Sequence, residues 1–213
     1  MVNDGSEVPM LGTLNSERGH HAYLSLGANL GDRWAAMQAA VRAMATLPHV
    51  ELDVPAGVAS MYETAPVGGP TGQTPYLNTV ITLRTWLSAR ELLAALHEIE
   101  TRLGRWRRIR WEPRTMDIDL LLFGDQSLRE NELSVPHPRL HERLFVLEPL
   151  AELAAEFVHP LLHRSIADLR AEVAAAASPG SVRRIMGPEW FSAPRGMSFA
   201  ADPPHRLDLE VGA

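Results

Sequence analysis

Two aspartates, Asp117 and Asp119, stand two positions apart at the start of an otherwise apolar run that ends at Phe123. Successive side chains of a β-strand point to opposite faces, so in a strand both carboxylates point the same way, with Cα atoms about 7 Å apart. Two carboxylates this close repel each other unless a cation lies between them. Mg²⁺ suits such a pair, because it takes one or two carboxylates and leaves its other positions to water and phosphate.

Arginines are concentrated immediately before the acidic pair. All 20 basic residues are arginines, and six lie within 13 consecutive positions, where an even spread predicts about one. These six are Arg102, Arg105, Arg107, Arg108, Arg110 and Arg114. Arginine binds phosphate oxygens in bidentate fashion and keeps its charge. Alone, the cluster also fits a solvated basic face or non-specific affinity for nucleic acid, and an acidic pair alone fits a charged strand end. Together they predict a magnesium–polyphosphate site.

A second group of residues suits a flat heterocycle. Tyr76 and Asn78 share one face of a predicted strand, and the preceding loop, residues 64–68, places backbone amides near the same end of the sheet. An aromatic ring offers a stacking surface, and an amide offers a two-way hydrogen-bonding edge. The alternative is a core tyrosine with a polar neighbour at a strand end, which the spacing alone favours.

Three further side chains are ambiguous. Trp111 lies among the arginines, where packing explains a tryptophan poorly, and a lid over a ligand is one interpretation. His137 stands between two prolines in a rigid turn, where a histidine more often bonds backbone than ligand. Phe145 begins a predicted helix, and such a phenylalanine is normally a core residue.

Hydrophobic periodicity and turn residues predict the elements that position these side chains. Strands are expected over 22–26, 50–60, 76–85 and 117–123, with a loop over 62–75 and a short hairpin around 127–133. Asp32 is a candidate N-cap for a helix to about Leu47, and Ser88 with Glu91 forms a capping box for a helix that Gly104 ends. Further helices are expected over 144–155 and from Ser165.

The order β-α-β-β-α-β predicts an α+β, ferredoxin-like fold: an antiparallel sheet with helices on one face, plus a C-terminal hairpin and helices. We expect a flexible tail over 1–21, a single domain over 22–175, and a mostly disordered tail over 176–213. In that last tail, Pro and Gly make up 9 of the 36 residues from Ser178 onward, without periodicity.

Composition excludes several classes of protein. The net charge of −6 and the single concentration of arginines favour a small anionic ligand over a long nucleic acid. Without cysteine there is no disulfide framework, thiolate zinc site or cysteine nucleophile. No apolar run approaches the roughly 20 residues that span a bilayer, and residues 1–21 lack the features of a secretory signal. We expect a cytoplasmic monomer that binds neither membrane nor nucleic acid.

Several motifs, in order from about Ala22 to Leu162, resemble the 6-hydroxymethyl-7,8-dihydropterin pyrophosphokinases of folate biosynthesis. They are residues 27–31 (GANLG), 62–66 (YETAP), 76–78 (YLN), 104–105 (GR), 110–121 (RWEPRTMDIDLL) and 135–138 (VPHP). The resemblance implies transfer of pyrophosphate from ATP to the pterin hydroxymethyl group, with release of AMP.

The resemblance also implies a role for individual residues. Asp117 and Asp119 would hold two Mg²⁺ ions, and the phosphate path would be lined by Arg105, Arg107, Arg110 and Arg114. The pterin would be bound by Thr64, Val67, Tyr76, Asn78 and Phe145, with Tyr76 and Phe145 on its two faces. The ATP side would be formed by Glu100, Leu120, His137 and Arg143.

Two alternatives stay open from the residues themselves. A nucleotidyltransferase could use the same acidic pair to attack the α-phosphorus, although it leaves Tyr76 and Asn78 unexplained. A ferredoxin-like RNA-binding module would carry stacking aromatics with basic neighbours on its sheet, and here only Tyr76 suggests one. Release of AMP, release of pyrophosphate, or no turnover would separate the three.

Overall fold

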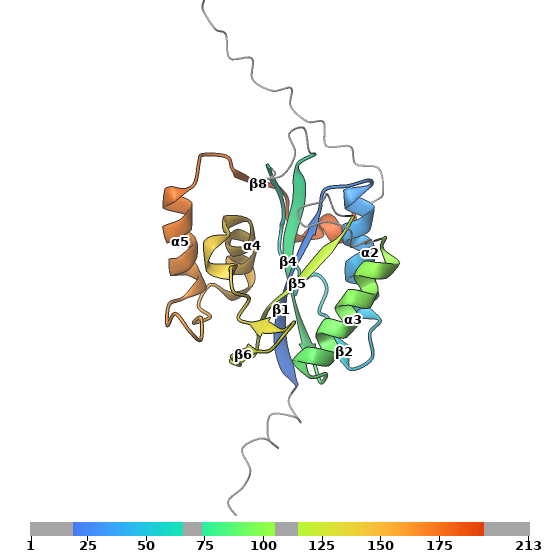
Figure 1. Cartoon of the computed structure of the whole chain (residues 1–213). Coiled ribbons are helices and arrows are strands. Elements are labelled where there is room, and N and C mark those ends of the chain that lie inside the picture. The colour runs from blue at the N-terminus through green and yellow to red at the C-terminus, as the bar shows by residue number, and fades with distance from the viewer. Residues whose placement is uncertain (1–18, 66–73, 105–114, 194–213) are drawn as a thin grey trace, which may run out of the picture.

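The computed structural model describes residues 19–65, 74–104 and 115–193, and an antiparallel sheet runs through its centre (Figure 1). The strand order is β5-β1-β4-β3-β8, and the short β2 pairs with one end of β4. These strands are β1 His20–Ala28, β2 Val50–Glu51, β3 Met61–Thr64, β4 Tyr76–Thr85, β5 Asp117–Phe123 and β8 Val182–Met186. A hairpin of β6 Leu128–Arg129 and β7 Ser134–Val135 stands apart. The order β5-β1-β4-β3 is that of the ferredoxin-like fold, so the predicted fold class is confirmed.

Helices cover both faces of the sheet (Figure 1). The predicted pair, α2 Arg33–Ala45 and α3 Ala89–Arg102, covers one face, while α4 Leu144–Ala154 and α5 Ile166–Ala176 cover the other. Each face therefore has its own buried apolar cluster. In the described ranges, no helix is long and apolar enough to cross a membrane.

The two helices between the strands begin where their capping residues predict. The Asp32 carboxylate accepts a hydrogen bond from the backbone N–H of Ala35 at the start of α2. At the start of α3, Ser88 and Glu91 form the complete capping box. Gly104 follows α3 with φ of 90°, a conformation that favours glycine at a helix end.

The strand predicted over 50–60 is wrong in most of its length. Only Val50–Glu51 forms a strand, and Pro55, which has no N–H to give to a ladder, lies in the irregular segment that follows. The pairing segment is instead β3, Met61–Thr64, in a region predicted as loop. The glycines and prolines that follow Ala65 in the sequence favoured a loop prediction for the whole segment, including the short strand that precedes them.

The prediction of a mostly disordered tail is wrong for residues up to Ser192. β8 pairs with β3, and the 3-10 helix η2, Pro188–Ser192, follows it. Trp190 of η2 is fully buried, and its indole N–H donates a 2.9 Å hydrogen bond to the Ala59 carbonyl. Its ring meets that of Trp34 edge-on, with centroids 5.9 Å apart. Pairing with a strand distant in sequence leaves no periodic signal in the segment itself.

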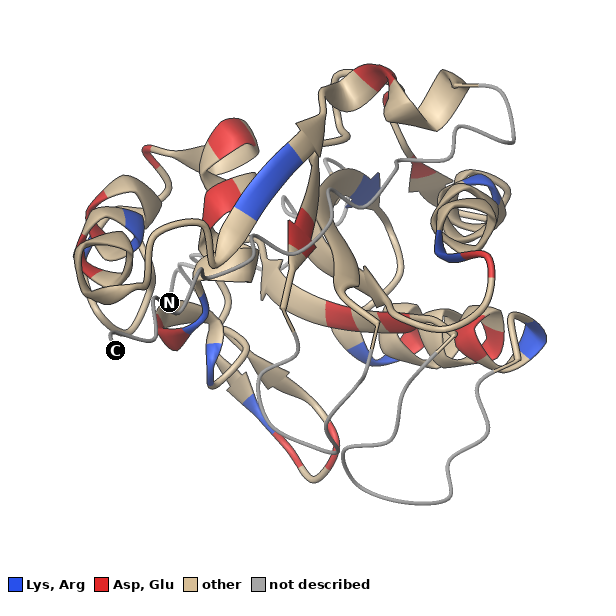
Figure 2. Cartoon of the chain, turned by 90° about the horizontal axis from the view of Figure 1, so that it is seen from above, with Lys and Arg blue, Asp and Glu red and all other residues tan. Residues whose placement is uncertain are grey.

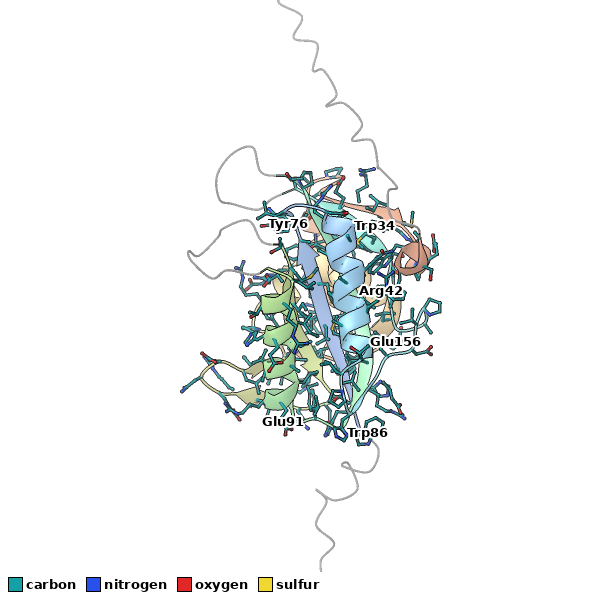
Figure 3. All side chains as sticks on the ribbon, turned by 90° about the vertical axis from the view of Figure 1, so that its right-hand side faces the viewer. Trp34, Arg42, Tyr76, Trp86, Glu91 and Glu156 are labelled. Carbon is teal, nitrogen blue, oxygen red and sulfur yellow. The ribbon has the colours of Figure 1, made fainter. Side chains whose placement is uncertain are left out.

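The two ends of the sheet differ in what they carry. Tyr76 and Trp34 lie at one end, and Trp86 lies at the other (Figure 3). The first end also carries the start of β5, because Asp117 pairs with Gly27 and Gly27 pairs with Asn78. β1 begins at His20, two residues before the predicted Ala22.

Candidate active site

Asp117 and Asp119 open β5 on the face that α4 and α5 cover. Both are partly exposed and alternate with buried Ile118 and Leu120, as the strand pattern predicts. Leu121, the next residue on their face, packs into the cluster formed with α4 and α5. The aspartates thus emerge where that cluster ends, at the edge strand of the sheet.

Glu100 fixes the backbone between the two aspartates. Its carboxylate accepts a 2.8 Å hydrogen bond from the N–H of Ile118, and the residue is only 1% exposed. Glu100 belongs to α3, so this bond joins the helix to the acidic strand. The resemblance implies that Glu100 lies on the ATP side. In the structure its carboxylate is buried in the core and bonded to the backbone of β5.

His137 and Arg143 supply hydrogen-bond donors next to Asp119. The Asp119 Oδ2 atom lies 3.7 Å from Arg143 Nη1 and 4.0 Å from His137 Nε2. Burial lowers the pKa of His137 to about 4, and the nearby charge of Arg143 adds to the shift. Burial also lowers the pKa of the Arg143 guanidinium, while Asp119 opposes that shift.

The hydrogen bonds of His137 define its tautomer. Its Nδ1 accepts a 3.2 Å hydrogen bond from the N–H of Arg139, and its backbone N–H donates to the Leu121 carbonyl at 2.8 Å. Neutral His137 therefore carries its proton on Nε2, the nitrogen that faces Asp119. Its lowered pKa keeps the imidazole neutral at neutral pH, with the Nε2–H facing Asp119.

The residues predicted to read a heterocycle also come together. The Asn78 side-chain N–H donates a 2.8 Å hydrogen bond to Thr64 Oγ1, and both residues are buried. Tyr76, half-buried, pairs with Thr64 at the last register position between β3 and β4. All three side chains share the face of the sheet on which Asp117 stands, because paired residues point the same way.

Gly27 lies between Asn78 and Asp117 in the sheet. The first strand was predicted to end at Leu26, but Gly27 lies inside β1 and pairs with Asn78 on one side and Asp117 on the other. A Cβ on Gly27 would lie 3.3 Å from Asn78 Oδ1. A glycine inside a strand often marks a place where a ligand or another backbone comes close. The position of Gly27 directly after the predicted strand was therefore the only local sign of this role.

Phe145 lies in the first turn of α4 beside the same site. The Arg143 guanidinium sits 5.7 Å from the centre of its ring, within the range of a cation–π contact. Phe145 also packs at the edge of the apolar cluster under α4. This packing agrees with the core role, and contact of the ring with a pterin stays a prediction.

A cleft of about 320 Å³ runs along β5 between α3 and the β6–β7 hairpin. Two of the predicted ATP-side residues, Leu120 and His137, line it together with Asp119. Leu93 and His97 of α3 line it as well and were not predicted, although their spacing to Glu100 puts all three along one side of the helix.

The remaining predicted residues lie outside the described ranges. They are Val67, Arg105, Arg107, Arg110, Trp111 and Arg114. Over the part of the chain that is described, acidic and basic residues are spread over helices and strands without forming one basic stripe (Figure 2).

Fold and site together define an α+β protein with an acidic pair beside the His137 imidazole and the Arg143 guanidinium at one end of an antiparallel sheet. The sequence model of the 7,8-dihydro-6-hydroxymethylpterin-pyrophosphokinase family matches residues 23–155. The chain belongs to this family.

Curated relatives agree over the same region. The 2-amino-4-hydroxy-6-hydroxymethyldihydropteridine pyrophosphokinase of Bacillus subtilis is 44% identical over 135 residues, which are 63% of this chain and 78% of that protein. The protein of the same name from Pseudomonas aeruginosa is 43% identical over 138 residues, 65% of this chain and 83% of that protein.

Solved structures support the fold. The HPPK-DHPS protein of Plasmodium falciparum matches with a TM-score of 0.58 at 13% identity, covering 74% of this chain. The match spans 45% of that longer chain.

Proposed function

We propose that this end of the sheet transfers pyrophosphate from ATP to 6-hydroxymethyl-7,8-dihydropterin. The hydroxymethyl oxygen forms a bond to the β-phosphorus, the bond from that phosphorus to the α–β bridging oxygen breaks, and AMP leaves. Family membership supports this chemistry, and the arrangement of the described residues supports the roles that we propose for them.

One observation carries the assignment: Asn78, Gly27 and Asp117 form a single row across three strands. The row spans two strand spacings, about 10 Å, which is the length of a pterin ring with its hydroxymethyl arm. A pterin whose edge meets Asn78 and Thr64 lies over Gly27 and directs its hydroxymethyl oxygen toward Asp117. The missing side chain at Gly27 leaves the floor under the ring open.

The nucleotide fits the other side of the acidic pair. The cleft along β5 has the volume of a small-ligand pocket, and it opens beside Asp119 and His137. ATP with its nucleoside in this cleft presents its phosphates to the His137 Nε2–H and the Arg143 guanidinium. Both donors are held by contacts within the protein, so they need little rearrangement when charge develops in the transition state.

The acidic pair has the donor chemistry that Mg²⁺ requires. Two carboxylates on one strand face are hard oxygen ligands, and among the described residues no third carboxylate, histidine or cysteine joins them. Phosphate and water would supply the other ligands. Bound there, Mg²⁺ neutralises charge on the phosphate oxygens. Several points stay predictions. They are the count of two ions, the phosphate contacts of the arginines in 105–114, the cytoplasmic location, the monomeric state and the absence of nucleic-acid binding.

Product analysis tests the proposal. The protein is incubated with ATP and the reduced hydroxymethylpterin, with Mg²⁺ or with EDTA, and nucleotides are separated by ion-exchange chromatography. We expect AMP to form only when pterin and Mg²⁺ are both present. Release of free pyrophosphate would indicate a nucleotidyltransferase, and the absence of turnover would favour a binding module.

A further inference from the structure

Arg33, the first residue of α2, lies beside the proposed pterin pocket without belonging to it. We propose that Arg33 is a positioning residue for this pocket: its guanidinium fixes the end of β3 relative to the start of β4, and so fixes Thr64 relative to Tyr76. The inference rests on the proposed function, because it assigns the pterin to these residues.

The contacts of Arg33 reach both strands. Its Nη1 donates a hydrogen bond to the carbonyl oxygen of Pro75, and the same nitrogen lies 3.5 Å from Glu63 Oε1. The Arg33 and Glu63 side chains are 24% and 23% exposed. The pair is thus partly shielded from water, where an ion pair is screened less than at the open surface.

The two contacted residues adjoin the pocket directly. Glu63 precedes Thr64, and Pro75 precedes Tyr76; Thr64 and Tyr76 are the last register pair between β3 and β4. Pro75 has no N–H with which to extend this ladder. A hydrogen bond from α2 to the Pro75 carbonyl therefore holds the backbone at the point where proline ends the ladder.

Arg183 provides a matched comparison. Its Nη2 lies 2.7 Å from the other carboxylate oxygen of Glu63, so both arginines pair with one acid. Arg183 belongs to β8, and among the described contacts it makes no hydrogen bond to Pro75. Losing either arginine removes one positive charge from Glu63, but only the loss of Arg33 releases Pro75.

Steady-state kinetics of Arg33→Met and Arg183→Met separate positioning from charge. We expect Arg33→Met to raise the KM for the pterin about tenfold, the effect of losing one charge-assisted hydrogen bond, with the KM for ATP and kcat changed less than about twofold. Arg183→Met should stay within about twofold of wild type in all three constants. Arg33→Lys keeps a cationic donor without the forked guanidinium and should fall between wild type and Arg33→Met.

Equal effects of the two methionine variants would overturn the proposal, because charge at Glu63 would then explain both. A rise in the KM for ATP as large as that for the pterin would also overturn it. If circular dichroism shows that Arg33→Met does not fold, Arg33→Lys against Arg183→Lys decides the same question by the same constants.

A binding measurement keeps this result distinct from a failure of the proposed function. Oxidised 6-hydroxymethylpterin is fluorescent, and its titration reports the pocket without turnover. Loss of pterin affinity in Arg33→Met but not in Arg183→Met supports the positioning role even if wild type releases no AMP, while unchanged affinity in both contradicts it.

Discussion

Asn78 and Asp117 are partners of the same residue: each pairs in register with Gly27, from opposite sides of β1. Their side chains stand on one face of the sheet about 10 Å apart, and the residue between them contributes no side chain. The distance between the Asn78 amide and the Asp117 carboxylate is therefore set by backbone hydrogen bonds, which vary little.

Replacing Gly27 tests this relationship. In Gly27→Ala the new Cβ meets Asn78 Oδ1 at 3.3 Å, so the amide must shift by a few tenths of an ångström and the floor of the pocket rises. We expect kcat/KM for the pterin to fall about tenfold, which is about 1.4 kcal/mol, with the KM for ATP unchanged. Thermal melts should show a loss of stability below about 1 kcal/mol, as for most single substitutions. Wild-type kinetics in Gly27→Ala would show that the pterin does not lie over this residue.

The acidic pair should be needed for turnover and for magnesium-dependent nucleotide binding. Asp117→Asn and Asp119→Asn keep the size of each side chain and remove its charge, and we expect kcat to fall at least about a hundredfold. Mg²⁺ with a non-hydrolysable ATP analogue should raise the melting temperature of wild type, and the rise should be lost in both variants.

Asp125→Asn is the matched control for the acidic pair. Asp125 is exposed just beyond the other end of β5, and the same substitution there should leave both kcat and the thermal shift unchanged. An equal effect of all three substitutions would mean that the two aspartates act only through the net charge of the protein.

Glu100 should act through the strand that it holds. Glu100→Leu leaves the Ile118 N–H without this acceptor, and we expect the free energy of unfolding to fall by about 2 kcal/mol and kcat by about tenfold or more. Glu100→Gln keeps an oxygen acceptor and should lose less of both. Glu98→Leu, on the exposed side of the same helix, should stay within about 0.5 kcal/mol of wild type in urea unfolding. A loss of kcat in Glu100→Gln as large as that in Glu100→Leu, without the loss of stability, would argue instead for direct ligand contact.

His137 predicts a specific pH dependence of stability. Burial lowers its pKa from 6.5 to about 4, so as pH falls through 6.5 the unfolded chain takes up a proton that the folded chain takes up only near pH 4. The free energy of unfolding should therefore fall between these two values, by on the order of 3 kcal/mol from this residue. Urea unfolding of the metal-free protein in EDTA measures it, and His137→Gln should show a shallower fall. Equal slopes in the two proteins would mean that His137 titrates normally in the folded state.

Local signals in the sequence predicted much of the fold and of the site. Alternation identified Asp117 and Asp119 as one face of a strand, and the capping residues Asp32, Ser88 and Glu91 marked the helix starts. These features depend on side chains within a few residues of each other, so a single sequence contains them.

The missed features depend on partners distant in the chain. β8 reads as an aperiodic segment, and its pairing with β3 exists only because the fold brings the C-terminal region back to that edge. The position of Gly27 between Asn78 and Asp117 likewise depends on its pairing with two neighbouring strands, β4 and β5. The bond from Arg33 to Pro75 spans 42 positions, and no spacing rule connects them.

The fate of the three phosphorus atoms of ATP tests the central claim most directly. ATP labelled at the α, β or γ position in separate reactions with Mg²⁺ and the reduced hydroxymethylpterin is followed into products by chromatography. Pyrophosphate transfer predicts that the β and γ labels both enter the pterin product, while the α label stays in AMP. An α label on the pterin, or a γ label without the β label, would contradict the account.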